Sequence, residues 1–406
     1  MNAGDTAFVL VSAALVMLMT PGLALFYGGM VRNKNVLGTI MQSFILLGII
    51  TLEWVLWGYS MAFGPDHAGI IGGLDWFGLN GVGMEPSPDY GSTIPHQAFM
   101  IFQCMFAVLT PALITGAFAE RVKFSAFLLF TLLWATFVYN PLCHWVWGVG
   151  GWMGKLGALD FAGGTVVHIS SGMSALAAAL IIGRRLGYGT TAYIPHNVPM
   201  TVTGAAILWF GWFGFNAGSA LACNGLAASA FVVTHIASAL AALTWMFMEW
   251  IHRGKPTTLG AASGAVAGLV AITPGSGFVG PVSAIIIGGM GGIICYSGVL
   301  LKSRLGYDDS LDVVAIHGLG GIWGALATGL FASKIVNPDA ANGLFFGNPG
   351  QLWIQFVSVI SSMVFAFVMT LIILKIVDVI MGLRVTEEDE VRGMDVSLHN
   401  EAGYTY

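Results

Sequence analysis

Two histidines lie inside strongly apolar stretches, where ionisable side chains are costly. His168 ends the string Asp160-Phe-Ala-Gly-Gly-Thr-Val-Val-His168, and His317 ends Asp312-Val-Val-Ala-Ile-His317. A neutral imidazole offers one donor and one acceptor, so two rings that share a hydrogen bond could line a narrow pore for a small neutral molecule. The alternative is two separate helix–helix contacts. A metal site is less favoured, because no third ligand follows at helical spacing.

Acidic residues accompany this pattern. Asp160 precedes an apolar helix and could cap its first turn, or set an electrostatic field for an arriving cation, and the two roles are compatible. We expect Asp312 to have the same role ahead of His317. Glu53 is different, because it lies among Leu, Trp and Val far from either end of its apolar stretch. It should be protonated or paired, but the sequence does not identify its partner.

Aromatic residues form a third group, which we place on the outer side. Phe102 and Phe106 are four residues apart and share one face of a helix. The others follow or end apolar stretches; they are Trp145, Trp147, Phe213 and Phe215, with Ser219 close behind. Most single aromatics in such a chain are packing residues or belong to the interfacial belt.

The composition decides which elements position these residues. Of 406 residues, 15 are basic and 20 acidic, so 9% are charged, while 56% are hydrophobic. Soluble domains contain about 25% charged residues, so a soluble fold is excluded. The chain contains no basic domain, which excludes nucleic-acid binding, and no soluble catalytic domain. We therefore expect an all-α polytopic membrane protein.

Apolar windows of about 20 residues predict eleven membrane spans. Their approximate bounds are Ala7–Met30, Leu37–Phe63, His96–Ala119, Phe124–Leu142, Phe161–Gly183, Pro199–Phe215, Gly225–Ile251, Leu259–Pro274, Val279–Leu301, Leu311–Phe331 and Leu352–Leu383. Twelve cations fall in the odd-numbered gaps and the tail, against Lys155 and Lys334 in the even ones. The positive-inside rule then places the amino end outside and the carboxyl end inside.

The two histidine strings lie five spans apart, which indicates an internal duplication. Five crossings reverse the starting side, so helices 1–5 and 6–10 form an inverted pseudo-repeat, followed by a long eleventh helix. We divide the chain into a transmembrane domain, residues 1–383, and a cytoplasmic tail, residues 384–406. The tail is either a short docking segment or a disordered end.

Five strings in order carry a resemblance to a known family. They are Pro21-Gly-Leu-Ala-Leu-Phe-Tyr-Gly-Gly29, Gly116-Ala-Phe-Ala-Glu-Arg121, the Asp160–His168 string, Gly211-Trp-Phe-Gly-Phe-Asn-Ala-Gly-Ser219 and His317-Gly, with Gly382-Leu-Arg-Val and its acidic continuation in the tail. The chain resembles the Amt/Mep/Rh ammonium transporter family over nearly its whole length, and its motifs are most similar to those of the prokaryotic Amt branch.

The resemblance implies roles for particular residues. Trp147, Phe106 and Ser219, with Phe102 and Asp160 nearby, would recruit ammonium at the outer mouth. Phe106 and Phe215 would stack as a gate, and His168 and His317 would be the twin pore histidines. No cofactor, metal or catalytic residue is implied, and Glu53 receives no role from the family.

The resemblance also implies partners and a location. The expected assembly is a homotrimer in the lipid bilayer of the cell (inner, cytoplasmic) membrane, with one pore in each subunit. A PII-type signal protein would dock on the cytoplasmic loop 184–198 and the tail. An ammonium sensor is the rival function; sensor forms often carry an added signalling domain, which we do not find in this chain. An intramembrane enzyme is disfavoured because no nucleophile or metal set is identifiable.

Elementary electrostatics favours a particular mechanism for such a transporter. Moving a bare ion of this size into a medium of low dielectric costs on the order of 20 kcal/mol. A cation–π contact supplies only about 0.5–2 kcal/mol. Aromatic rings can therefore select a cation at the mouth but cannot carry it through an apolar pore. We expect ammonium to lose its proton and to cross as ammonia, with proton co-transport left open.

Overall fold

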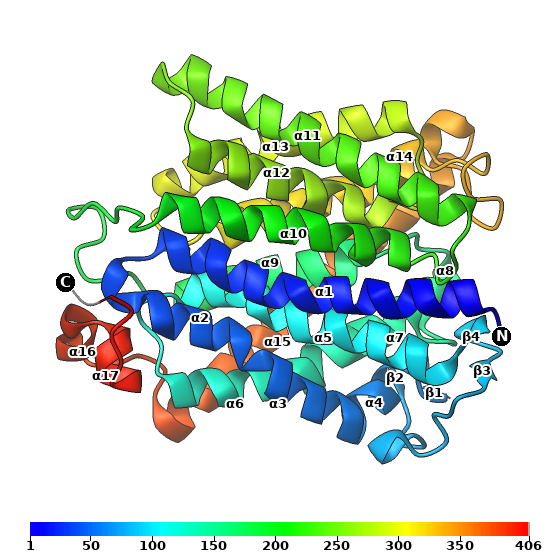
Figure 1. Ribbon diagram of the computed structural model, residues 1–406, viewed down its shortest axis with the longest axis horizontal. Coiled ribbons are helices and arrows are strands. Elements are labelled where there is room, and N and C mark those ends of the chain that lie inside the picture. The colour runs from blue at the N-terminus through cyan, green and yellow to red at the C-terminus, as the bar shows by residue number, and fades with distance from the viewer. Residues whose placement is uncertain (405–406) are drawn as a thin grey trace.

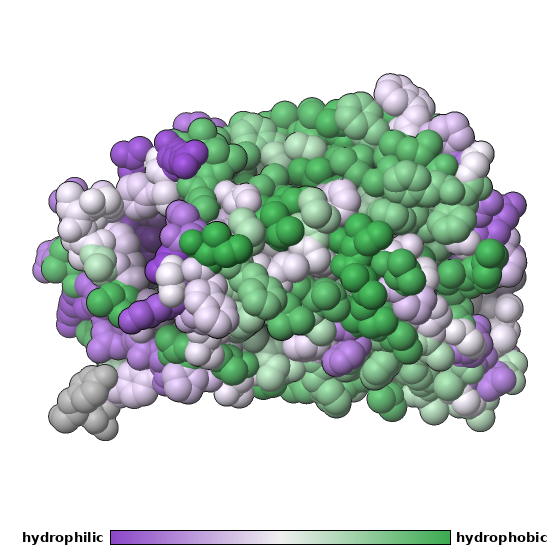
Figure 2. Space-filling view, turned by 90° about the horizontal axis from the view of Figure 1, so that it is seen from above, coloured by the Kyte–Doolittle hydropathy of each residue, from purple (hydrophilic) through white to green (hydrophobic). Residues whose placement is uncertain are grey.

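Long helices run side by side along one axis of the molecule, and the two termini lie at its opposite ends (Figure 1). The computed structural model describes residues 1–404. We call the end that carries the N-terminus the N face and the end that carries the tail the C face. Apolar residues cover the middle of the flank, while hydrophilic residues gather towards the two ends (Figure 2). This distribution is that of a protein whose flank meets lipid and whose ends meet water.

The first half of the chain contains the short strands as well as helices. Its elements are α1 (Ala3–Met30), η1 (Asn33–Asn35), α2 (Val36–Phe44), α3 (Leu46–Glu53), η2 (Trp54–Gly58), α4 (Tyr59–Phe63), β1 (Asp66–His67), β2 (Ile71–Gly72), η3 (Phe77–Leu79), β3 (Pro86–Ser87), β4 (Gly91–Pro95), α5 (His96–Phe118), α6 (Phe124–Trp134), η4 (Ala135–Tyr139), α7 (Asn140–Trp147), α8 (Trp152–Leu156), η5 (Gly164–Ile169) and α9 (Ser170–Ile182). Strands β1 and β2 pair antiparallel, as do β3 and β4, in the loop on the N face.

The second half contains helices and connecting loops, with no strand among its described residues. Its elements are α10 (Val198–Gly218), α11 (Gly225–Arg253), α12 (Thr258–Ile272), η6 (Thr273–Gly275), α13 (Pro281–Leu305), η7 (Val314–Leu319), α14 (Gly320–Phe331), η8 (Leu344–Phe346), α15 (Pro349–Met381), α16 (Glu387–Arg392) and α17 (Met394–His399). Four of the η segments are π-helical: η2, η4, η5 and η7.

Eleven helical segments within residues 1–404 are long and apolar enough to cross a membrane, as the sequence predicted. The fourth differs most from its predicted bounds, because it extends from Phe124 to Leu156 rather than ending at Leu142. Trp145 and Trp147 therefore belong to this span, in α7, and not to a loop beyond it. The prediction ended too early because Pro141 and the polar residues around it interrupt the apolar run; the π-helical η4 precedes that proline, which occupies the first turn of α7.

The first helices of the two halves, α1 and α10, pack closely through glycines. A Cβ at Gly204 would lie 2.2 Å from the backbone nitrogen of Phe26, and one at Gly29 would lie 2.5 Å from the carbonyl oxygen of Asn197. Small residues let helix backbones approach in this way inside a membrane, where packing replaces the hydrophobic effect as the force between helices. The inverted five-helix repeat is thus joined along its first helices.

The tail is folded against the C face. Glu390 of α16 accepts a hydrogen bond from the backbone N–H of Leu186 (2.7 Å) and pairs with Arg384 (2.6 Å). Asp395 of α17 accepts from the backbone N–H of Gly38 (2.8 Å). The described part of the tail is therefore ordered, while a docking role for it stays a prediction. The division of the chain at residue 383 stays a prediction.

Three arginines pair with two buried acids on the C face. Arg32 and Arg185 contact Glu120, at 2.7 and 3.5 Å, and Arg185 and Arg121 contact Asp308, at 2.9 and 3.3 Å. Burial acts to raise the pKa of Glu120, but the hydrogen bond from Arg32 and the charges of Arg185 and Arg32 outweigh it, so this pKa lies below its ordinary value. Several arginines thereby fix the loops that join helices at this end.

The crossing of α9 with η7 supplies a test of the fold. A Cβ at Gly172 would lie 2.2 Å from the backbone nitrogen of Gly318, so Gly172→Ala must push two helix backbones apart. We expect a loss of about 1–3 kcal/mol, the usual cost of overpacking. The matched control is Gly48→Ala, because nothing lies within 4 Å of a Cβ at Gly48. Thermal unfolding in detergent should show a lower Tm for Gly172→Ala and no loss for Gly48→Ala; equal Tm values would contradict this packing.

Candidate functional site

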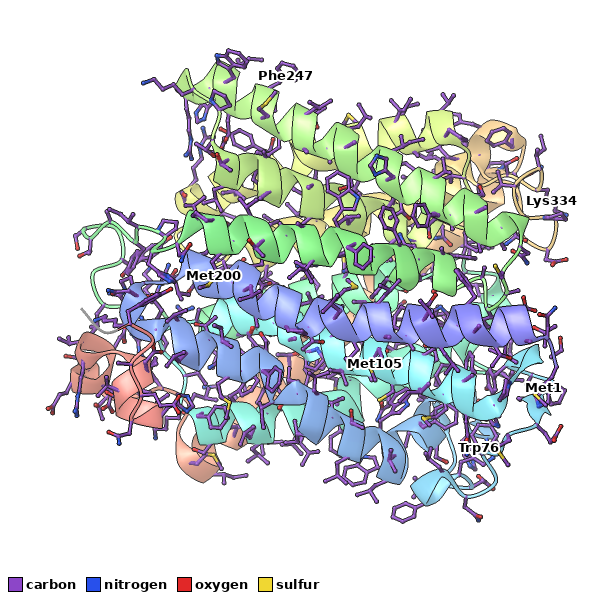
Figure 3. The ribbon with its side chains drawn as sticks, in the orientation of Figure 1. Met1, Trp76, Met105, Met200, Phe247 and Lys334 are labelled. Atoms are coloured by element: carbon purple, nitrogen blue, oxygen red, sulfur yellow. The ribbon has the colours of Figure 1, made fainter. Side chains whose placement is uncertain are left out.

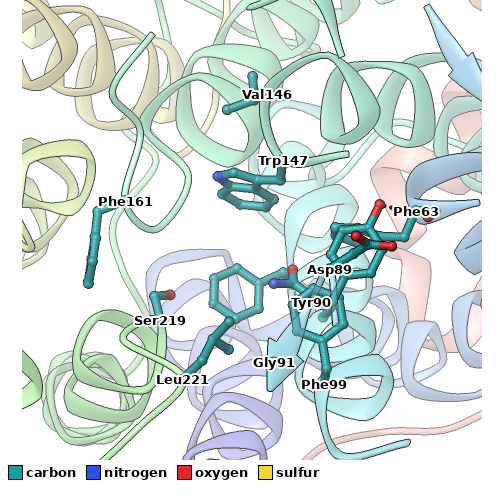
Figure 4. Close-up of a pocket in the computed structure, with 12 residues that line it drawn as sticks. Phe63, Asp89, Tyr90, Gly91, Phe99, Val146, Trp147, Phe161, Ser219 and Leu221 are labelled. Carbon is teal, nitrogen blue, oxygen red and sulfur yellow. Dashed lines mark hydrogen bonds between the residues drawn. The ribbon is translucent and has the colours of Figure 1, made fainter. Parts of the chain in front are cut away.

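A cavity of about 380 Å³ opens on the N face, where α5, α7 and the end of α10 meet. It is lined by Phe63, Asp89, Tyr90, Gly91, Phe99, Gln103, Phe106, Val146, Trp147, Phe161, Ser219 and Leu221. Phe161 and Ser219 lie on one side of it and Phe63 and Tyr90 on the other, with Trp147 between them (Figure 4). Three of the five residues predicted for the recruitment site, Trp147, Phe106 and Ser219, thus share one cavity.

Phe106 lines this cavity, and its ring packs against that of Phe215. The rings of Phe106 and Phe215 have centroids 4.2 Å apart and planes inclined at 33°, and both side chains are buried. Trp147 meets Phe106 edge to face at 6.1 Å. Met105, the neighbour of Phe106 in the chain, lies between the two ends of the helices, whereas Met1 and Trp76 lie at the N face (Figure 3). Phe106 thus contacts both the cavity and Phe215, which does not line it.

The two histidines lie directly behind this pair. The ring centroid of His168 is 6.1 Å from that of Phe215 and 5.3 Å from that of His317. Their Nδ1 atoms are 3.2 Å apart, which is hydrogen-bond distance when one ring donates and the other accepts. Trp212 stacks on His168 at 5.5 Å. Both imidazoles are almost fully buried, and Nε2 of His168 has no hydrogen-bond partner.

Backbone geometry places both histidines. His168 lies in η5 and His317 in η7, and each π-helical segment opens one of the two spans that the repeat relates. A π-helical turn rotates the side chains that follow it and often occurs at functional sites. The glycine contact of Gly172 with Gly318 lets the two segments approach until the rings touch. The structure therefore joins two strings that are about 150 residues apart in the chain.

Asp160 organises the N face through hydrogen bonds. Its carboxylate accepts from the backbone N–H groups of Gly163 (2.9 Å), Gly164 (2.6 Å) and Thr165 (2.7 Å), and from the Thr165 hydroxyl. Its backbone carbonyl accepts from the indole N–H of Trp147 at 2.8 Å. The capping role proposed from the sequence agrees with these bonds. Its side chain does not line the cavity, so Asp160 acts on that cavity by holding Trp147 and η5.

The counterpart of Asp160 in the second half is Asp309, and the expectation for Asp312 was wrong. Asp309 accepts from the backbone N–H of Val314 (2.8 Å), five residues later, just as Asp160 accepts from Thr165. Asp312 instead has φ +61° and pairs with Lys302 at 2.5 Å. Both capping acids precede their histidines by eight residues. From the sequence we chose Asp312, which is nearer to His317. The eight-residue spacing shared by the two capping acids is hard to see because the residues in between differ.

Other predicted residues differ in how closely they contact the cavity. Phe102 is buried behind the cavity wall and meets Phe106 edge to face at 5.0 Å. Sequence reasoning missed Tyr90, whose hydroxyl donates to the carbonyl of Phe63 (2.8 Å) and accepts from the N–H of Val149 (2.9 Å). It also missed Asp89, which brings a carboxylate to the mouth. The excess of acids in the loop 64–95 was the available signal for Asp89.

Comparison with known proteins gives one consistent family. The family model described as Ammonium Transporter Family matches residues 7–404. The chain is 56% identical to the ammonium transporter of Bacillus subtilis, covering 100% of this chain and 99% of that one. It is 51% identical to ammonium transporter Amt1 of Archaeoglobus fulgidus, with 100% of both chains covered.

Solved structures agree with the sequence comparison. The crystal structure of Saccharomyces cerevisiae Mep2 matches with a TM-score of 0.90 at 37% identity, covering 96% of this chain and 88% of that one. A structure described as a Sensor Amt Protein matches with a TM-score of 0.90 at 31% identity, covering 98% of both.

Replacing the capping acid tests its role on the N face. Asp160→Ala removes the acceptor for three backbone N–H groups, and we expect it to lower stability by about 0.5–2 kcal/mol. Asp160→Asn keeps one acceptor oxygen and should lose less. The Tm of the two variants measures this order. If both variants lower the Tm equally, the acceptor oxygen that Asn keeps contributes little. The negative charge of Asp160, which both variants remove, would then explain the loss better than the cap.

Asp309 predicts a pH dependence of stability. Burial, aided by Asp312 and opposed by Lys302, raises its pKa from 3.8 to about 6. The folded protein therefore binds this proton more tightly than the unfolded chain does, so its stabilisation is full below pH 3.8 and is lost as pH rises through about 6. Asp309→Asn lacks this contribution. Measured between pH 4 and 6, the Tm of the variant relative to the native chain should rise with pH, by the equivalent of about 1–3 kcal/mol; a falling difference would contradict the assignment.

Proposed function

The chain belongs to the ammonium transporter family, and from that premise we propose how it moves its substrate. Ammonium enters the cavity on the N face, where Trp147, Phe106 and Ser219 receive it. It loses its proton there, either back to the water outside or to a separate relay through the histidine pair, and ammonia passes the gate of Phe106 and Phe215 and then the pair of His168 and His317. The single observation that carries this proposal is the position of the histidine pair directly behind the phenylalanine pair.

The cavity suits a small cation. The faces of the aromatic rings attract positive charge, at about 0.5–2 kcal/mol per contact. The hydroxyl oxygen of Ser219 has a free lone pair to accept from an N–H of ammonium, since its own proton is donated to the carbonyl of Phe215 (2.9 Å). Asp89 adds negative charge at the entrance. These contributions concentrate ammonium at the mouth but are far smaller than the cost of burying the ion beyond the gate.

The buried histidines suit a neutral molecule. With Nδ1 atoms in contact, the pair presents ring edges that can both donate to and accept from ammonia, which itself donates and accepts. Neither ring contacts an acid that would favour an imidazolium; their ring neighbours are Trp212, Phe215 and each other. The same hydrogen-bonded pair offers a route by which the proton can follow separately, which would make transport electrogenic.

Topology and assembly belong to the same proposal. The bias of cations towards the C face places the N face outside and the C face in the cytoplasm of the cell membrane. The assembly is a homotrimer in which each subunit has its own pore. A PII-type signal protein would meet the C face at the loop 184–198 and the tail, residues 384–406, which lie together there through the contact of Leu186 with Glu390.

Sensing is the second candidate function, because one similar solved structure is described as a Sensor Amt Protein. The two functions differ in flux: a sensor needs only to bind ammonium. Purified protein in liposomes on a solid-supported membrane separates them. A sustained current after an ammonium jump, or internal alkalinisation without current, supports transport, whereas neither signal in a folded protein supports the sensor.

Histidine variants test the pore. His168→Ala and His317→Ala each remove one ring of the pair, and we expect the ammonium-driven current to fall by at least about tenfold, equivalent to about 1.4 kcal/mol in the barrier. The matched control is His235→Ala: this histidine lies on the outer flank against Trp209 and should not affect the current. An unchanged current in either pore variant would refute the role of the pair.

A further inference from the structure

Glu53 is a carboxyl group buried at membrane depth and outside the path described above. It ends α3, where the second span passes into the π-helical η2, and 1% of its surface is exposed. A buried ionisable residue in a membrane span is costly, and is therefore a candidate functional site. The conduction pathway does not use it, since it faces neither the cavity on the N face nor the histidine pair.

The partners of Glu53 are neutral and few. Its Oε1 accepts from the side-chain amide of Asn140 at 2.8 Å. The hydroxyl of Thr136 is 3.3 Å from the same oxygen, but its single proton has a closer acceptor in the carbonyl of Leu132, at 2.9 Å. The indole of Trp57 donates to the hydroxyl of Thr136 at 3.0 Å. Oε2 has no hydrogen-bond partner. One firm donor is too little for an ionised carboxylate, which has about four acceptor sites.

Charged side chains do not make up for this lack of hydrogen-bond donors. Among residues 1–404, no Lys, Arg or His forms an ion pair with Glu53. Its titratable neighbours are Cys104 of α5 and Tyr139 of η4, both neutral when protonated. The adjoining α2, α6 and η2 contain no titratable residue. A bare carboxylate here would face a desolvation cost of several kcal/mol, which favours the protonated form of the group.

Two other buried glutamates of this chain show the contrast. Glu120 is equally buried but contacts Arg32 and Arg185. Glu249 accepts from both the N–H (3.0 Å) and the hydroxyl (2.8 Å) of Thr257, at the N-terminus of α12, where the helix dipole favours negative charge. Glu53 has neither an arginine nor a helix N-terminus. Its environment is that of a carboxylic acid.

The surroundings of Glu53 leave this acid little freedom. A Cβ at Gly58, at the end of η2, would lie 2.3 Å from Oε2, so a larger residue there would displace the carboxyl group. On α5, Cys104 is two residues from both Phe102 and Phe106, which places it on the opposite side of that helix. Glu53 therefore lies on the side of α5 that faces away from Phe106, and Asn140 links it to the fourth span.

We propose that Glu53 is a proton-binding site, set behind α5 and separate from both the N-face cavity and the histidine pair. In the neutral form it joins the second and fourth spans through Asn140. In the ionised form it places an unpaired charge against α5. The site is assigned by this geometry, independently of the function proposed above.

Infrared difference spectroscopy of the protein in liposomes tests this directly, without ammonium. Raising the pH from mildly acidic to alkaline should remove the carbonyl band of a protonated carboxylic acid, because Glu53 releases its proton. The band should be absent from the difference spectrum of Glu53→Gln, which keeps the size of the side chain, and present in that of the control Glu249→Gln. Identical difference spectra for the native chain and Glu53→Gln would overturn the proposal.

A second variant keeps the test decisive if Glu53→Gln does not fold. Asn140→Ala removes the one firm donor to the ionised form, so the band should disappear at a higher pH than in the native chain. Labelling glutamate with ¹³C assigns the band to Glu rather than Asp. A band that does not shift in Asn140→Ala, or that does not respond to the label, would refute the assignment to Glu53.

Discussion

The cost of taking a charge out of water is the constraint on which the rest of this structure depends. On the C face, ion pairs offset this cost: Glu120 and Asp308 are buried, and arginines contact both. Along the path from the cavity to the histidines the chain meets it by using side chains without permanent charge, from Trp147 through Phe106 and Phe215 to His168. On our proposal, a path built this way excludes ions and admits small neutral molecules, so ammonium would use it only after losing its proton.

Backbone irregularity is what places the side chains on that path. His168 and His317 each lie in a π-helical segment at the start of a span, and each segment is capped by an aspartate eight residues before the histidine. Such irregular turns at membrane depth are tolerated because they are buried in protein, where neighbouring groups satisfy the backbone. The inverted repeat brings the two segments together. Glu53, at a third π-helical segment, uses the same kind of turn for an acid that no arginine contacts.

Much of this architecture could be predicted from the sequence, and the failures have physical reasons. Apolar windows of about 20 residues indicated the eleven spans, and the motif strings around the histidines and aromatic residues indicated the family. The predicted end of the fourth span was wrong, because a π-helical turn lets the helix continue past Pro141. Asp309 was missed because a cap is defined by which N–H groups it reaches, and Asp312 was nearer. The partner of Glu53 could not be found, because Asn140 lies 87 residues away and on another span.

The account depends most directly on deprotonation, and one measurement isolates it. K⁺ resembles ammonium in size and charge but has no proton to lose. In the same liposomes on a solid-supported membrane, the current and the internal pH are recorded after matched jumps of ammonium and of K⁺. The account predicts a protein-dependent current or alkalinisation with ammonium and no current with K⁺. A sustained K⁺ current comparable to that of ammonium would show that an intact cation crosses, and would contradict the account.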